Sequence, residues 1–247
     1  MHGPADRLRR GPSVATRPAD AAAAGPGARG DGRRPDNGPV TVPAERLAEA
    51  VAAAGPVLVD VGCGDGRHTV RWAERRPDAL VVGLDAETTR LDRAVAVARK
   101  RKLGVLFVAA AAEYPPEPLR GRCVEIAVVM PWGSLLDGIL GADPDVLHAV
   151  LGLGAPGATL DAVVNVRPWD APESVDRKLA ATPEPTAEHL ERLAGVYAEM
   201  GWALDPAGLL SDAEARGLGS TWASRVVAAR ASQLLRLRAT SRVGAPA

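Results

Sequence analysis

The chain of 247 residues has few aromatic and few sulfur-containing side chains, and it lacks the features of several specialised classes of protein. Its two cysteines, Cys63 and Cys123, are too few for a disulfide framework and have no metal-ligand spacing, and its four histidines form no cluster. We therefore expect no structural metal and no histidine-activated nucleophile. No stretch approaches the roughly 18 apolar residues of a membrane span, and the N-terminus lacks the apolar segment of a signal peptide. These absences predict a cytoplasmic protein.

The first forty residues almost entirely lack large apolar side chains. They consist mainly of Ala, Gly, Pro and Arg, as in ADAAAAGPGARGDGRRPDNG. Such a segment buries too little apolar surface to offset the entropy lost on ordering it. Residues 1–40 are therefore predicted to be disordered, or to be a mis-annotated extension upstream of the true start. Residues 41–247 are predicted to form a single domain.

Acidic and basic residues are equal in number, 30 of each, so the net charge gives no sign of a nucleic-acid partner. Their distribution is uneven, however. The segment RLDRAVAVARKRK at 90–102 holds six basic residues and one acid, and no Asp or Glu follows Glu214, although six arginines do. This segregation predicts one basic face, although either cluster alone is also typical of a solvated helix end.

From about residue 40 the sequence alternates strand-like and helix-like segments, which is typical of a parallel sheet covered by helices. Apolar strand-like runs lie at 56–62, 79–85, 103–110, 123–130 and 158–166, with two more expected near 203–211 and 232–240. Helical patterns lie at 68–77, about 87–102, 134–140, 144–154 and 186–202, the last with Thr186 as N-cap and Gly201 at its end. The prediction is an α/β fold with a mostly parallel, seven-stranded sheet and helices on both faces.

A glycine-rich turn, VDVGCGDGRH, follows the first predicted strand and precedes a helix. Gly62, Gly64 and Gly66 let the backbone turn sharply and allow a ligand to approach it closely. Asp85 ends the next strand, where a carboxylate can accept both hydroxyls of a ribose. A dinucleotide site usually has the spacing G-x-G-x-x-G. The spacing here is G-x-G-x-G with Asp60 in the strand before it, a pattern similar to the first motif of the class I methyltransferases, and this resemblance favours S-adenosylmethionine over a nicotinamide cofactor.

This turn resembles the first motif of the class I S-adenosylmethionine-dependent methyltransferases, which have a Rossmann-like fold. The resemblance implies that Asp60 helps to orient the methionine end of the cofactor. It also implies that Ala112 and Glu113, after the third strand, lie where such enzymes contact the adenine. The simpler alternatives are that Asp60 is a buried acid satisfied by loop amides and that Glu113 is an ordinary exposed residue.

The segment EIAVVMPWGSLLDGIL places Trp132 on a turn directly after the fourth strand. In open α/β sheets the ligand crevice lies beyond the carboxyl ends of the strands, so Trp132 is expected to project into it. Methyltransferases that act on exocyclic amines often have Asn or Asp before Pro-Pro-aromatic at this place. Here the residues are Met130, Pro131 and Trp132, and a ring nitrogen needs no such acceptor because its lone pair is already available. The alternative is that Trp132 is a core aromatic.

Several segments, in order and spacing, resemble those of the kanamycin–apramycin resistance methyltransferases, which methylate N1 of adenine 1408 in 16S rRNA. They are DVGCGDGRHT, LVVGLDA, MPWGSLLDGILG, PEPT, YAEMGW and STWASRVVAAR. The resemblance implies that Trp132 and Trp222 sandwich a flipped adenine. It also implies that rRNA is bound by Arg225 and Arg230, by Ser220 and Thr221 in the linker before the second tryptophan, and by the cluster Arg99, Lys100, Arg101 and Lys102.

The implied substrate is the assembled small (30S) ribosomal subunit, modified by a monomer without a metal. Family members usually begin with a hairpin before the first core strand, whereas GPVTVPAERL offers at most one strand. Two other functions stay open. One is a methyltransferase of the same fold that acts on a small molecule, and the other is an RNA-binding relative with little catalysis.

Overall fold

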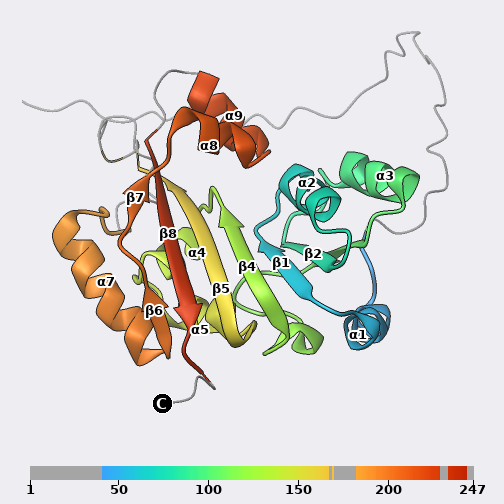
Figure 1. The fold of residues 1–247 in the computed structure, drawn as a ribbon, viewed down its shortest axis with the longest axis horizontal. Helices are drawn as coiled ribbons and strands as arrows, with labels where there is room; N and C mark the ends of the chain where they lie inside the picture. Colours follow the sequence, from blue (N-terminus) through green and yellow to red (C-terminus); the bar gives the residue numbers. More distant parts are fainter. Residues whose placement is uncertain (1–40, 167–168, 170–181, 229–232, 244–247) are drawn as a thin grey trace, which may run out of the picture. The chain divides into compact units, whose positions relative to one another are not determined.

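A mixed β-sheet with helices on both faces forms the part of the chain described in the computed structural model, residues 41–166, 169, 182–228 and 233–243 (Figure 1). The strands are β1 (Val57–Val61), β2 (Leu80–Asp85), β3 (Val105–Ala109), β4 (Cys123–Val129), β5 (Gly154–Asn165), β6 (Trp202–Leu204), β7 (Gly208–Leu209) and β8 (Leu234–Ser241). Their order is β3-β2-β1-β4-β5-β8-β6, and β7 pairs with β8. Strands β1 to β5 run parallel, while β8 is antiparallel to each of its neighbours. The predicted α/β fold with a mostly parallel sheet is confirmed.

The helices connect these strands and cover the sheet. They are α1 (Ala44–Ala53), α2 (Arg67–Arg75), α3 (Asp92–Arg101), α4 (Ser134–Ile139), α5 (Pro144–Leu151), α7 (Ala187–Glu199), α8 (Asp212–Gly217) and α9 (Thr221–Ala228), with a 3-10 helix at Glu117–Leu119. Thr186 caps α7 as predicted, because its hydroxyl accepts a hydrogen bond from the backbone N–H of His189 at 3.2 Å. Gly201 follows the helix with φ +77°.

Strand β1 is buried on both faces, which explains its uninterrupted apolar sequence. Val57, Val59 and Val61 belong to a core shared with residues of α1, α4, α5 and α7. Leu58 packs instead in a cluster with Trp72 of α2. On this second face, α8 and α9 contribute small buried residues to a further cluster with Val163 of β5. The sheet is therefore covered on both sides, as expected for a parallel sheet.

Three predicted boundaries differ from the structure. The strand expected near 203–211 is divided into β6 and β7, because Pro206 lies between them and has no N–H to donate. The helix expected from about residue 87 begins at Asp92, after a turn in which Asp85 Oδ1 accepts from Glu87 N at 2.8 Å. Strand β5 begins at Gly154, four residues earlier than predicted, and its pairing with β4 contains a register shift.

The segment directly before β1 forms α1, an unpredicted helix, whereas the one strand that GPVTVPAERL offered lies largely outside the described residues. Within the described part, the N–H of Val42 donates to Phe107 O of β3 at 3.0 Å. The prediction for residues 1–40 lies outside the described residues and stays a prediction. Of the helices in the described ranges, none has the length and apolar composition needed to cross a membrane.

Candidate functional site

The glycine loop, residues 62–66, turns the chain from the end of β1 into α2. The backbone N–H groups of Gly62 and Cys63 both donate to Leu84 O of β2, at 2.8 and 3.0 Å. All three glycines have φ between +59° and +73°, a region that other residues rarely adopt. A Cβ on Gly66 would lie 2.7 Å from Ala94 Cβ of α3, whereas a Cβ on Gly64 would meet open space. Gly66 therefore serves close packing, and Gly64 leaves room at the site.

Asp85, at the carboxyl end of β2, is held against the glycine loop. Its Oδ2 accepts from Gly64 N at 2.7 Å, and its Oδ1 accepts from Glu87 N at 2.8 Å. The two hydrogen bonds fix the direction of the carboxylate, and each oxygen keeps a second lone pair for another donor. The geometry fits the predicted contact with a ribose.

Asp60 is almost fully buried at the end of β1, next to the start of α2. Thr69 Oγ1 donates to Asp60 Oδ2 at 2.6 Å. His68 Nδ1 lies 3.1 Å from the same oxygen, although its angle is not that of a hydrogen bond. Two side chains of α2, rather than loop amides, therefore surround this acid, and it still borders the cavity described below.

Cys63 lies inside the glycine loop with its thiol buried. Burial raises the pKa of the Cys63 thiol far above its usual range, and the nearby carboxylates of Asp60 and Asp85 raise it further. The thiol therefore stays protonated at neutral pH and is a poor nucleophile. The site offers no cysteine-based covalent chemistry at this residue.

Trp132 lies on an unusual turn between β4 and α4. Met130 has φ +60°, in the left-handed region that is uncommon for a side chain of this kind, and its N–H donates to Val163 O at 2.8 Å. Gly133 also has a positive φ, +60°. The turn leaves the Trp132 side chain 52% exposed, so the core-aromatic alternative does not describe it.

One cavity of about 600 Å³ connects these features, a volume within the usual range for a small-molecule site. It is lined by predicted site residues from five separate segments, namely Asp60, Gly62, Gly64, Asp85, Ala112, Glu113, Trp132 and Ser220. Gly66 and Thr221 do not line it. The structure thus brings the predicted cofactor residues other than Gly66, together with the first tryptophan, to the carboxyl ends of the parallel strands.

The second tryptophan belongs to α9, which lies close to α8 near the ends of β4 and β5 (Figure 1). The side chain of Trp222 and all of Arg230 lie outside the described residues. Thr221 and Ser220 are half-buried at the start of α9, and Arg225 is exposed on it. Ala223 is fully buried against the sheet and anchors the helix.

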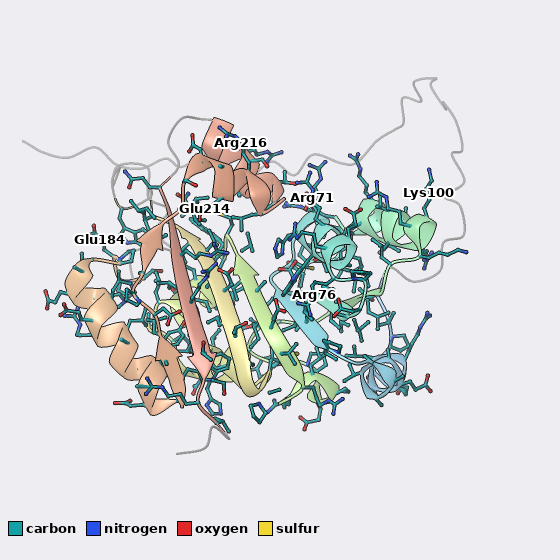
Figure 2. All side chains as sticks on the ribbon, viewed as in Figure 1. Arg71, Arg76, Lys100, Glu184, Glu214 and Arg216 are labelled. Atoms are coloured by element: carbon teal, nitrogen blue, oxygen red, sulfur yellow. The ribbon has the colours of Figure 1, made fainter. Side chains whose placement is uncertain are left out.

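The predicted basic cluster at the end of α3 is divided between two hollows. Arg101 lines a groove between α2 and α3 and pairs with Glu74 of α2. Arg99 and Lys102 line a different hollow, beside Arg46 of α1. Lys100 is exposed at the far end of the helix (Figure 2). None of the four reaches the cavity at Trp132.

The groove between α2 and α3 contains Arg67 and Arg71, functional candidates that sequence reasoning missed. It is also lined by Arg90, Arg93 and Arg101 of the predicted basic segment 90–102, together with only two acids, Asp65 and Glu74. The signal was present as helical spacing, because Arg67 and Arg71 are one turn apart. Arg71 lies between α2 and the α8–α9 pair (Figure 2). Asp65 and His68, which border the cavity, were also missed.

The described residues contain no group of three His, Cys, Asp or Glu side chains that could hold a metal ion. Two acids in the sheet region have cationic partners instead. Arg236 of β8 makes a two-pronged contact with Asp161 of β5, at 2.7 and 2.5 Å, which raises the pKa of the arginine. Arg76 pairs with Glu125 of β4.

Comparison with known proteins gives a consistent assignment. Residues 37–241 match the family model NpmA, described as 16S rRNA (adenine(1408)-N(1))-methyltransferase. A protein of that name from Streptoalloteichus hindustanus is 39% identical over 180 residues, which cover 70% of this chain and 81% of that protein.

Two solved structures share the fold. The 16S rRNA methyltransferase KamB superposes with a TM-score of 0.71 at 34% identity, covering 80% of this chain and 93% of that one. A mutant 16S rRNA (adenine(1408)-N(1))-methyltransferase from Catenulisporales acidiphilia, solved with cosubstrate SAM, gives a TM-score of 0.69 at 31% identity. That match covers 83% of this chain and 94% of the other.

Proposed function

The chain belongs to the family of 16S rRNA (adenine(1408)-N(1))-methyltransferases, and from this premise we propose how its own residues perform the reaction. It is an S-adenosylmethionine-dependent methyltransferase whose target is N1 of adenine 1408. We propose that the modification gives resistance to aminoglycosides of the kanamycin and apramycin type, and a relative described as an aminoglycoside resistance methyltransferase supports this. The substrate we propose is the assembled 30S subunit in the cytoplasm, and we propose that the protein binds it as a monomer.

The cavity at the sheet edge suits S-adenosylmethionine. All four cofactor residues Asp60, Asp85, Ala112 and Glu113 line it. In the proposed arrangement Asp85 accepts from the ribose hydroxyls, Ala112 and Glu113 contact the adenine, and Asp60 orients the methionine end. The open space beside Gly64 lets a ligand approach the backbone. When bound, S-adenosylmethionine supplies an electrophilic methyl group on a sulfonium. A ring nitrogen can attack this methyl carbon with its lone pair without first losing a proton.

The exposed indole of Trp132 in the cofactor cavity is the observation that carries the proposal. Extruding a base from its stack costs a few kcal/mol. Stacking on an aromatic side chain returns roughly 1–3 kcal/mol per base. A base between Trp132 and Trp222 thus recovers much of the extrusion cost, and it is held beside the methyl donor away from water.

No proton acceptor is needed at the target side of the cavity. Amine-modifying enzymes have Asn or Asp before Pro-Pro-aromatic, whereas here Val129 and Met130 precede Pro131 and Trp132, so this acceptor is missing. Cys63, the nearest thiol, stays protonated. The chain therefore works by orienting the base and by excluding water, which fits a ring nitrogen as the acceptor of the methyl group.

Basic side chains near the cavity supply a docking surface for rRNA. Arg225 is exposed on α9, and the arginines of the α2–α3 groove adjoin the cavity through Asp65, which lines both hollows. Arg230, Ser220 and Thr221 complete the proposed contacts beside the second tryptophan, and Arg99, Lys100, Arg101 and Lys102 extend them. Contacts to phosphates release counterions, so this affinity falls steeply with salt.

Incubating the purified protein with labelled S-adenosylmethionine and intact 30S subunits tests the proposal. We expect label in 16S rRNA and a primer-extension stop at adenine 1408. Free 16S rRNA and a metabolite extract serve as the alternative substrates. Transfer to the extract alone would instead identify a small-molecule methyltransferase, and binding without transfer would identify an inactive relative.

A further inference from the structure

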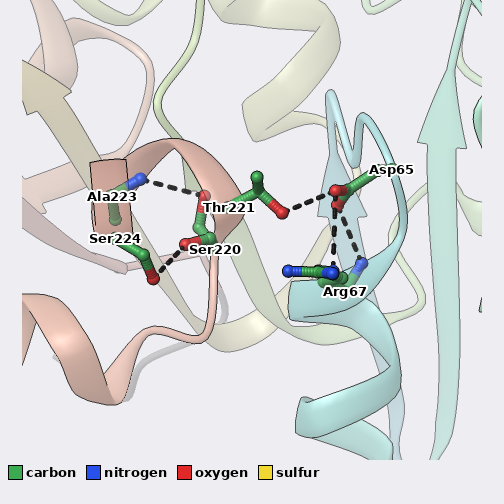
Figure 3. A network of polar contacts seen from close by, with 6 residues as sticks. All are labelled: Asp65, Arg67, Ser220, Thr221, Ala223 and Ser224. Atoms are coloured by element: carbon green, nitrogen blue, oxygen red, sulfur yellow. Dashed lines mark hydrogen bonds and ion pairs between the residues drawn. The ribbon is translucent and has the colours of Figure 1, made fainter. Parts of the chain in front are cut away.

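The glycine loop and the start of α9 are joined by a hydrogen bond between side chains 156 positions apart. Thr221 Oγ1 donates to Asp65 Oδ2 at 2.6 Å, in a partly buried position (Figure 3). Asp65 also receives the backbone N–H of Arg67 at 3.2 Å, which orients its carboxylate. The contact connects the cofactor side of the cavity to the residue that directly precedes Trp222.

A second contact joins the same two regions. A Cβ on Gly219 would lie 2.3 Å from Arg71 Cδ and 3.0 Å from Arg71 Nη1, so the Arg71 side chain lies directly against this glycine. Gly219 has φ +73°, which also favours glycine. The linker Gly219–Thr221 is therefore held at both ends by residues of the glycine loop and α2.

The other hydrogen bonds of the linker stay within α8 and α9, and Gly219 N donates to Arg216 O of α8 at 3.4 Å. Ala223 N donates to Ser220 Oγ at 3.4 Å, and Ser224 Oγ donates to Ser220 O at 2.9 Å (Figure 3). They close the first turn of the helix, and neither reaches the glycine loop. Ser224 thus provides a hydroxyl on the same helix whose removal leaves the Asp65–Thr221 contact intact.

The loop that holds Thr221 is also the loop that meets the cofactor. Gly64, adjacent to Asp65, donates to Asp85, and all three residues line the cavity. A ligand that orders this backbone also orders the Asp65 carboxylate. A second ligand that needs the same segment ordered then loses less conformational entropy when it binds.

We propose that Asp65 and Thr221 are a positioning pair that couples the cofactor to the base clamp. Cofactor binding orders the glycine loop, Asp65 then fixes Thr221, and Thr221 sets the place of Trp222 and Arg225. Because such coupling is reciprocal, docked rRNA strengthens cofactor binding in turn. The inference rests on the proposed function only for the identity of the base.

Hydrogen exchange of the amides at 219–228, measured with and without S-adenosylmethionine, tests the coupling in the absence of ribosomes. We expect the cofactor to slow exchange in this segment in the wild type, in Thr221→Ser and in the control Ser224→Ala. In Thr221→Val the slowing should disappear, although residues 62–66 remain protected. Cofactor-dependent slowing that persists in Thr221→Val, or that is absent from the wild type, overturns the proposal.

Kinetics on 30S subunits provide the second readout. Losing a hydrogen bond to a charged group costs enough to reduce kcat/KM for the subunit by about tenfold in Thr221→Val. The Kd for S-adenosylmethionine without subunits should stay within about twofold, and Thr221→Ser should restore the rate, because its hydroxyl also donates. In an Asp65→Ala background, Thr221→Val should add little further loss.

The two readouts distinguish the two levels of the proposal. If the wild type is inactive on subunits but shows cofactor-dependent slowing of exchange at 219–228, the proposed substrate is wrong and the proposed coupling is still supported. If the wild type methylates adenine 1408 and Thr221→Val is as active as Ser224→Ala, the proposed coupling is wrong and the proposed substrate is supported.

Discussion

The glycine loop at 62–66 and the linker at 219–221 border the same cavity region but are fixed by different kinds of contact. The loop is held mainly by backbone hydrogen bonds, from Gly62 and Cys63 to Leu84. The linker is held toward the cofactor side by the Thr221 hydroxyl and by the Arg71 side chain. The cofactor side is therefore tied to the sheet through its backbone, and the target side depends on individual side chains.

Gly66→Ala, in the glycine loop, is expected to have the largest effect of the substitutions considered, namely a loss of folding stability. The added Cβ would lie 2.7 Å from Ala94 Cβ and 2.8 Å from Phe107 Cε1, at φ +71°. Overpacking and left-handed strain together should reduce the free energy of unfolding by about 2–4 kcal/mol in denaturant titrations. The expected defect is in stability rather than in turnover of the folded fraction.

Gly64→Ala is the matched control for this prediction. Its Cβ meets open space inside the cavity, so the loss of unfolding free energy should be only about 1–2 kcal/mol, from φ +59° alone. Affinity for S-adenosylmethionine, measured by calorimetry, should fall instead. If Gly64→Ala is as unstable as Gly66→Ala, with unchanged cofactor affinity, the two glycines do not have these separate roles.

Trp132→Ala is the next largest change and acts on the target side. Removing the stacking face, worth about 1–3 kcal/mol, should reduce turnover on 30S subunits by about 10- to 100-fold. The Kd for S-adenosylmethionine should change little, because Asp85 and the glycine loop are untouched. Trp132→Phe keeps an aromatic face and should retain most activity. Equal losses of turnover and cofactor affinity would show that Trp132 is structural.

Local sequence signals were enough to predict most of the cofactor side. The strand before the glycines, the helix after them and Asp85 at the next strand end lie close together in the sequence, so their spacing predicts one site. Helix α1 was not predicted, although its buried residues Leu47 and Val51 have helical spacing. Pro43 precedes the helix without a side-chain cap, so the apolar spacing is the local signal that could have found it.

The target side could not be predicted in the same way, because it depends on contacts distant in sequence. Nothing near Asp65 indicates that it accepts a hydrogen bond from Thr221. The left-handed backbone of Met130, which presents Trp132, is decided by packing of the β4 end rather than by its own preference. Likewise the rotation of α3 decides that Arg101 enters the groove while Arg99 faces away.

A smaller effect is expected from the basic surface. Removing one cationic side chain that binds a phosphate should lower the slope of log affinity against log salt by about 1. Arg93→Ala, in the α2–α3 groove, should therefore reduce the salt dependence of 30S binding, measured by filter binding between about 50 and about 200 mM salt. Lys100→Ala, at the far end of α3, tests how far the surface extends. An unchanged slope for Arg93→Ala would exclude the groove from the docking surface.

The smallest effect is expected in the labelling rates of the two buried thiols, Cys63 and Cys123. These rates measure how often the cofactor side opens. Burial raises the pKa of Cys123 to about 12, and burial with two neighbouring carboxylates raises that of Cys63 further. The folded protein should therefore resist thiol labelling at about pH 8, and each cysteine should react only when its surroundings open.

In the single-cysteine variants Cys63→Ser and Cys123→Ser, labelling rates report opening of β4 and of the glycine loop, respectively. S-adenosylmethionine should slow labelling of Cys63 at least as much as that of Cys123, since it binds against the loop. Rapid labelling of Cys63 in the presence of cofactor would mean that the loop opens freely even with its ligand bound. The contrast between a cofactor side anchored by its backbone and a target side held by side chains would then fail.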